Sequence, residues 1–130
     1  IELSRVNRIS AILERHAGLD LSGDDIYINV AGGMKIKEGS VDLAVALALY
    51  SSKTDIPLSS SLASFGELSL AGEVRPVTFS QRRLRTLTEM GFSKIIVSIG
   101  TEKVGGSQSE NVKDIRSAVI AAFKGRKKNK

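Results

Sequence analysis

Residues 39–50 of the chain read GSVDLAVALALY, and this stretch decides the fold. After the aspartate, apolar side chains occupy every position, with alanines between the larger residues. A helix that is apolar nearly all round is buried inside a domain and does not lie on its surface. The pattern therefore predicts a central, buried helix from Ser40 to about Ser52, and its small alanines let other elements approach closely.

Signals on both sides of this stretch alternate between helix and strand. Apolar residues at helical spacing, with capping residues and closing glycines, predict three further helices: Ser4 to Gly18, Ser80 to Met90, and one that begins at Asn111. Alternating or continuous apolar runs predict strands at residues 26–30, 62–66, 68–77 and 95–99. Residues 100–109 are predicted to form a polar loop. This order predicts an α+β fold, in which a mixed sheet is packed with helices.

The size and composition are those of one domain. The chain has 130 residues, of which 42% are hydrophobic and 25% are charged. It has no cysteine, which excludes disulfides and cysteine-ligated zinc and fits a reducing cytoplasm. The longest apolar run, residues 43–50, is too short to cross a membrane. Because the chain lacks an initiator methionine and a signal peptide, we expect it to be a piece of a longer protein.

The net charge of +5 belongs to the C-terminus. Its five cations are Lys124, Arg126, Lys127, Lys128 and Lys130, and the rest of the chain holds 14 basic and 14 acidic residues. We expect a domain over residues 1–123 and a basic, disordered tail over residues 124–130. This tail either keeps the protein in solution or binds phosphate groups.

Ser40 is the residue of chemical interest. It follows Gly39 at the start of the buried helix, where the positive end of the helix dipole can stabilise a developing oxyanion. The alternative is a purely structural role, because serine is a favoured helix N-cap. The chain has no phosphate-binding Gly-x-x-x-x-Gly-Lys run, and nothing around its single histidine, His16, supports a catalytic triad.

The run around Ser40, together with Phe65-Gly66-Glu67 and residues 72–77 (GEVRPV), resembles the Lon serine protease domain. The resemblance implies that Ser40 occupies the nucleophile position and that Arg83 replaces the lysine of the Ser-Lys dyad. A dyad lysine must give up its proton to act as a base, whereas an arginine stays charged. Val41-Asp42 also replaces the Ala-Gly of that family, and the proline before the serine is missing.

The helical phase of residues 80–90 turns Arg83 inward, on the side of Leu87 and Met90. One interpretation is that Arg83 holds a carboxylate near the old site, either Asp42 or Glu67. The other is that its stem packs while its charged head reaches water.

Several motifs together resemble the C-terminal Lon-like domain of RadA-type (Sms) bacterial DNA repair proteins. They are Asn7-Arg8, residues 25–33 (DIYINVAGG), residues 40–48 (SVDLAVALA), Phe65-Gly66-Glu67 and residues 82–85 (RRLR). The resemblance covers about residues 5–123. That group often has alanine at the position of Ser40.

This resemblance implies a ribosomal protein S5 domain 2-like fold, as in Lon proteolytic domains. It implies a non-proteolytic, cytoplasmic domain that supports a homohexamer and binds single-stranded or branched DNA, with RecA as a further partner. No metal or cofactor is expected in this domain, while ATP and zinc are expected in absent N-terminal domains. The alternative is an active Lon-type, ATP-dependent serine peptidase domain.

DNA contact requires cations on one surface. The candidates are Lys35, Lys37, Arg75, Arg82 and Arg85. No aromatic residue is expected among these charges, so the prediction is contact with the DNA backbone without base stacking. The alternative is a solvated helix face.

Overall fold

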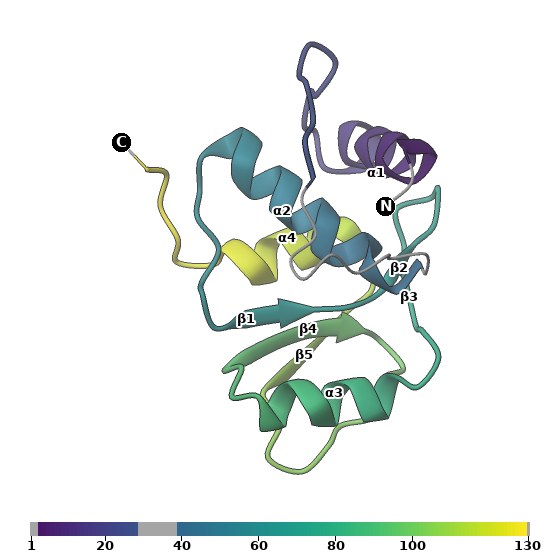
Figure 1. Ribbon diagram of the computed structural model, residues 1–130, viewed down its shortest axis with the longest axis vertical. Helices are drawn as coiled ribbons and strands as arrows, with labels where there is room; N and C mark the ends of the chain where they lie inside the picture. The colour runs from purple at the N-terminus through teal and green to yellow at the C-terminus, as the bar shows by residue number, and fades with distance from the viewer. Residues whose placement is uncertain (1–2, 29–38, 130) are drawn as a thin grey trace.

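A three-stranded parallel sheet forms the middle layer of the domain (Figure 1). The computed structural model describes residues 3–28 and 39–129. The strands are β1 (Leu62–Ser64), β4 (Lys94–Ser98) and β5 (Ser109–Val112), in the order β1-β4-β5. Ala63 lies opposite Ile95 in one pair of strands, and Val97 lies opposite Asn111 in the other.

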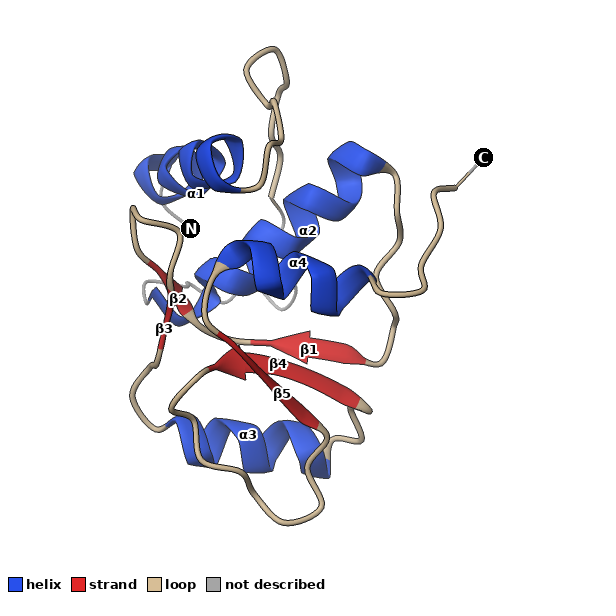
Figure 2. Ribbon diagram, turned by 180° about the vertical axis from the view of Figure 1, so that it is seen from behind, coloured by secondary structure: helices blue, strands red, loops and turns tan. Residues whose placement is uncertain are grey.

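Helices cover both faces of this sheet, as Figure 2 shows from behind. On one face, α3 (Ser80–Glu89) packs its buried Leu84 with Ile95 and Val97 of β4. On the other face, Ile96 joins a larger core with α1 (Leu3–His16), α2 (Asp42–Thr54) and α4 (Ile115–Phe123). Successive side chains of a strand point to opposite faces, so β4 supplies both cores.

The central helix α2 confirms the main sequence prediction, with two differences. The residues of α2 that are buried are Asp42, Leu43, Ala46 and Leu47, whereas Ala44 and Ala48 are exposed on the opposite side. The helix is therefore buried along one broad face and not all round. A short 3-10 turn, η2 (Gly39–Val41), precedes it, so Ser40 lies in that turn and is not the cap of α2.

An antiparallel ribbon of two strands lies beside η2. Its strands are β2 (Glu67–Leu68) and β3 (Val74–Arg75), joined by a turn that contains Gly72 at φ +83°. The ribbon is separate from the parallel sheet within the described residues, whereas the sequence predicted one mixed sheet. The Val74 N–H donates to the Lys113 carbonyl (3.0 Å), which ties the ribbon to the chain between β5 and α4.

The last helix begins later than predicted, because Asn111 belongs to β5 and does not cap it. The Asn111 amide donates to the carbonyls of Ser98 and Thr101, both at 3.0 Å, and so supports the loop before β5. Asp114 caps α4 instead, since its carboxylate accepts a hydrogen bond from the Ser117 N–H at 2.8 Å. This bond holds the pKa of Asp114 below its ordinary value.

Three other sequence predictions differ from the structure or lie partly outside it. Ser4 does not cap α1, because that helix already includes Leu3. Ser80 is the first residue of α3, and the cap position is Phe79. In the predicted strand at 26–30, residues 26–28 form no strand, and residues 29–30 lie outside the described residues.

The basic C-terminal segment is exposed from Lys124 to Asn129, and two of its residues bond to the loop after α2. The Asn129 N–H donates to the Asp55 carbonyl (2.7 Å), and the Arg126 guanidinium donates to the Pro57 carbonyl (2.9 Å). The domain boundary at residue 123 and the disorder of the tail stay predictions. No helix within residues 3–28 and 39–129 is long and apolar enough to span a membrane.

Candidate functional site

Ser40 is held at the meeting point of the central helix and the ribbon. Its carbonyl accepts a hydrogen bond from the Gly66 N–H (2.9 Å), and the Gly66 carbonyl accepts one from the Leu43 N–H (3.0 Å). A Cβ atom at Gly66 would lie 2.8 Å from the Val74 side chain, so glycine allows this close approach. Ser40 itself is only 5% exposed.

Arg83 points toward Ser40 from the first turn of α3. Its Nη1 lies 3.4 Å from the Ser40 Oγ, which is a long hydrogen bond, and its Nε donates to the Thr78 carbonyl at 3.0 Å. A guanidinium only donates hydrogen bonds and stays charged, so it is not a base for the serine. Within the described part of the chain, no lysine amine bonds to Ser40, and Lys35 and Lys37 lie outside that part.

Asp42 is paired with Arg5, so the interpretation that Arg83 holds Asp42 is wrong. Arg5 Nη1 lies 2.8 Å from Asp42 Oδ1, and the other carboxylate oxygen accepts the Leu68 N–H at 3.1 Å. The carboxylate side chain is 2% exposed and the arginine side chain 22%. Helix α1 thus supplies the cation for the acid that follows Ser40, which explains how a buried charge is accommodated there.

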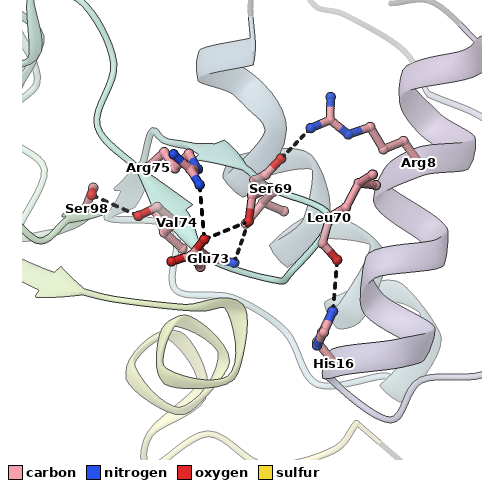
Figure 3. A network of polar contacts seen from close by, with 9 residues as sticks. Arg8, His16, Ser69, Leu70, Glu73, Val74, Arg75 and Ser98 are labelled. Atoms are coloured by element: carbon pink, nitrogen blue, oxygen red, sulfur yellow. Dashed lines mark hydrogen bonds and ion pairs between the residues drawn. The ribbon is translucent and has the colours of Figure 1, made fainter.

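Further contacts from α1 hold the ribbon in place (Figure 3). Arg8 donates to the Leu68 carbonyl at 3.0 Å, and the His16 ring nitrogen Nε2 donates to the Leu70 carbonyl at 3.0 Å. The ring of His16 also packs against Gly72, where a Cβ would lie 2.8 Å from it. The single histidine therefore anchors a turn, as expected for a residue without a catalytic context.

Glu67 lies beside the turn that carries Ser40. A Cβ atom on Gly39 would come within 2.5 Å of the Glu67 carboxylate, so a larger residue before Ser40 would require the flexible end of Glu67 to move. Gly39, Ser40, Glu67 and Arg83 thus form a polar cluster of four residues around the end of the ribbon. The described charged groups of this cluster are the Arg83 guanidinium and the Glu67 carboxylate, beside the Ser40 hydroxyl.

The predicted DNA-binding arginines differ in their surroundings. Arg75 pairs with Glu73 (3.2 Å) on the surface of the ribbon, as Figure 3 shows, and both side chains are more than half exposed. Arg82 and Arg85 are exposed and lie three residues apart on α3, hence on neighbouring positions of one helix face. The structure describes no position for Lys35 or Lys37.

Sequence reasoning missed one residue in this region. Phe79 lies between Arg75 and Arg82 along the chain, and its ring centroid is 5.0 Å from the Arg82 guanidinium carbon. The expectation that no aromatic residue accompanies these cations is therefore wrong. An apolar Phe79 between the polar Thr78 and Ser80 was the available signal.

Away from Ser40, a hollow of about 460 Å³ opens between α2 and the chain before residue 29. Val45, Leu49 and Ile26 are among its apolar lining residues. At its rim the Lys53 ammonium lies 2.8 Å from the Asp24 carboxylate, which raises the pKa of Lys53. No group of three or more His, Cys, Asp or Glu side chains in the described ranges is placed to hold a metal ion.

Comparison with known proteins places this arrangement in a family. A family model described as subunit ChlI of Mg-chelatase matches residues 2–101. The chain is 47% identical over 102 residues to the DNA repair protein RadA of Treponema pallidum (strain Nichols), covering 78% of this chain and 22% of that protein. The chain belongs to the ChlI family and is a RadA-related domain.

Two further relatives extend the match over nearly the whole RadA-related domain. The DNA repair protein RadA of Escherichia coli (strain K12) is 39% identical over 122 residues, or 92% of this chain and 26% of that protein. The DNA repair protein RadA of Haemophilus influenzae (strain ATCC 51907 / DSM 11121 / KW20 / Rd) is 39% identical over 121 residues, or 93% and 26%. The chain spans about a quarter of the length of these curated relatives.

Proposed function

We propose that the chain is the non-proteolytic Lon-like domain of a RadA-type DNA repair ATPase, which contacts DNA and supports ring assembly. The observation that carries the non-proteolytic assignment is the contact of the Arg83 guanidinium with the Ser40 Oγ. The DNA repair assignment rests on the RadA relatives.

A serine nucleophile needs a neighbouring group that accepts its proton. The described partner of the Ser40 hydroxyl is a donor that remains charged, so it offers the hydroxyl no base. Among the described residues, Asp42, the acid two residues after Ser40, has one oxygen on Arg5 and the other on the Leu68 N–H, and so it is occupied as well. Ser40 and Arg83 then serve to attach α3 to the turn before α2.

DNA contact is proposed for the exposed face of α3, through Arg82 and Arg85, with Arg75 from the ribbon. The ion pair of Arg75 with Glu73 is exposed and therefore weak, so a phosphate group can replace the carboxylate. The proposed ligand is single-stranded or branched DNA. Lys35 and Lys37 are proposed to add to the same surface.

The finer features of the proposal concern the fold and the complete protein. The fold is proposed to be the ribosomal protein S5 domain 2-like fold of Lon proteolytic domains. The complete protein is proposed to be a cytoplasmic homohexamer that acts with recombination proteins such as RecA. Its ATP and zinc are proposed to bind other domains, not this one.

A peptidase assay tests the first part of the proposal. An unstructured fluorogenic peptide is incubated with the chain, with Ser40→Ala and with Arg83→Lys. We expect no cleavage by the first two proteins. Cleavage that disappears in Ser40→Ala would show a working peptidase and contradict the proposal, whereas cleavage by Arg83→Lys alone would show that the arginine silences the site.

A salt titration tests the second part. The affinity for labelled DNA is measured between low and moderate salt for the chain and for Arg85→Ala. The slope of log K against log salt is negative, and loss of one phosphate contact should reduce its magnitude by about one, uniformly across DNA sequences. An unchanged slope for Arg85→Ala would remove this face of α3 from the DNA contact.

A further inference from the structure

The side chain of Phe79 is exposed to solvent, and its backbone has a conformation that phenylalanine rarely adopts. It is 66% exposed, and its φ of 56° lies in the left-handed region. That region is unfavourable for bulky side chains, and such outliers persist where the surrounding structure enforces them. Here the Phe79 carbonyl accepts the Arg83 N–H (3.0 Å), so the first turn of α3 holds the residue in place.

Arg82 covers one side of this exposed ring. Its guanidinium carbon lies 5.0 Å from the ring centroid, which is the range of a cation–π contact. A flat ring and a flat cation together offer a surface on which another flat, electron-rich group can stack, next to a positive charge. Such a pair suits single-stranded nucleic acid, because the ring can stack on a base while the cation contacts a phosphate.

We propose that Phe79 and Arg82 form a stacking platform for a base of single-stranded nucleic acid. This inference rests on the proposed DNA contact and specifies its ligand: an unpaired strand, recognised through a base and not only through phosphates. Arg85, on the neighbouring position of α3, supplies the phosphate contact beside the platform.

Two acidic groups of the described residues, on the ribbon and after β4, are engaged with partners of their own. Glu73 is paired with Arg75 at 3.2 Å, and Glu102 accepts a hydrogen bond from the Gln81 amide at 3.4 Å. The platform itself carries the positive charge of Arg82, with the exposed Arg85 on the neighbouring position of α3, and this charge complements a polyanion. A second copy of this chain, with its net charge of +5, or a peptide without acidic residues would lack this matched charge.

The test separates base stacking from phosphate contact. Fluorescence anisotropy measures binding of the chain to a labelled oligodeoxythymidylate of about 20 nucleotides, long enough to cross one domain. The second probe is an abasic strand of equal length, which keeps the phosphates and lacks the bases. The variants are Phe79→Leu, Phe79→Tyr and, as a matched control, Tyr27→Leu, because Tyr27 is also an exposed aromatic residue (90%) and lies outside α3.

Loss of one stacked base should weaken binding of Phe79→Leu to oligodeoxythymidylate by about five-fold or more. Its binding to the abasic strand should be unchanged. Phe79→Tyr should keep the affinity because it keeps the ring, and Tyr27→Leu should keep it because its site is remote. Circular dichroism checks that each variant is folded.

Other outcomes overturn the inference in distinguishable ways. If Phe79→Leu binds the oligodeoxythymidylate and the abasic strand as tightly as the unchanged chain does, base stacking on Phe79 is refuted, while the proposed DNA contact stands. If it loses affinity for both strands equally, Phe79 only positions α3. If Phe79→Leu changes self-association or peptide binding alone, the platform is a protein interface. If the unchanged chain binds neither strand at low salt, the proposed function fails as well.

Discussion

The ion pair between Arg5 and Asp42 gives the sharpest stability prediction. The helical phase of Arg83 makes it a candidate partner of Asp42, whereas the structure pairs Asp42 with Arg5. Substituting each of the three residues by alanine, singly and in the two pairs that contain Asp42, tests this choice. The double-mutant cycle isolates each pair from whatever else its arginine contacts.

The expected magnitude follows from the contacts of the buried carboxylate. Asp42→Ala removes a charged hydrogen bond, worth about 1.5–3 kcal/mol, and leaves the buried Leu68 N–H without its acceptor, which costs about 1–3 kcal/mol. The total of about 2.5–6 kcal/mol brackets the usual cost of about 3–5 kcal/mol for breaking a buried pair. Asp42→Asn keeps an acceptor for Leu68 and should cost about half as much.

Urea and thermal unfolding measure these changes. For a chain of this length, the Tm of Asp42→Ala should fall by about 10 °C or more. The coupling energy should be about 1.5–3 kcal/mol for Arg5 with Asp42, and below about 1 kcal/mol for Arg83 with Asp42. A larger coupling for Arg83, or a loss below about 1 kcal/mol in Asp42→Ala, would refute the reasoning.

Two helix ends give further predictions. Asp55 at the C-cap of α2 has φ +60° and places an acid at the negative end of the helix dipole, so Asp55→Gly should stabilise the chain by about 0.5–1 kcal/mol. A lower Tm for Asp55→Gly would contradict this. The hydrogen bond from the Ser117 N–H lowers the pKa of Asp114 in the folded chain below its unfolded value of 3.8. The charged carboxylate therefore stabilises the fold above the unfolded pKa, and this stabilisation is lost as the pH falls through the lower pKa of the folded state. The advantage of the wild type over Asp114→Asn in urea should therefore shrink from about pH 5 downward, and a pH-independent difference would exclude this effect.

Patterns close in sequence account for the features that were predicted correctly. The apolar run of residues 43–50 predicted the central helix α2, and residues 95–99 predicted the most buried strand, β4. Gly18 and Gly91 both have positive φ just beyond the ends of α1 and α3, as expected of residues that close helices. These features depend on periodicity and on the conformational freedom of single residues, which a sequence displays directly.

Local sequence patterns did not determine which distant strands and helices pair with each other. Strand β5 is short, with polar residues at three of its four positions, and it becomes a strand only because β4 offers it a parallel neighbour. The local pattern therefore predicts Asn111 as a helix cap, whereas the side chain that accepts a free N–H of α4, that of Ser117, belongs to Asp114. Both residues are good caps, and the position of β5 decides between them.

The sequence by itself determined the α+β class, the buried central helix and the family resemblance, because these depend on local pattern and on motifs. Only the tertiary structure decided which arginine meets which acid, and that Phe79 lies against Arg82. The long side chain of an arginine can reach several acidic residues, and the sequence does not distinguish between them. The packing of α1 and α3 on the core selects one of them, because it sets which distances are short enough for a hydrogen bond or a stacked ring.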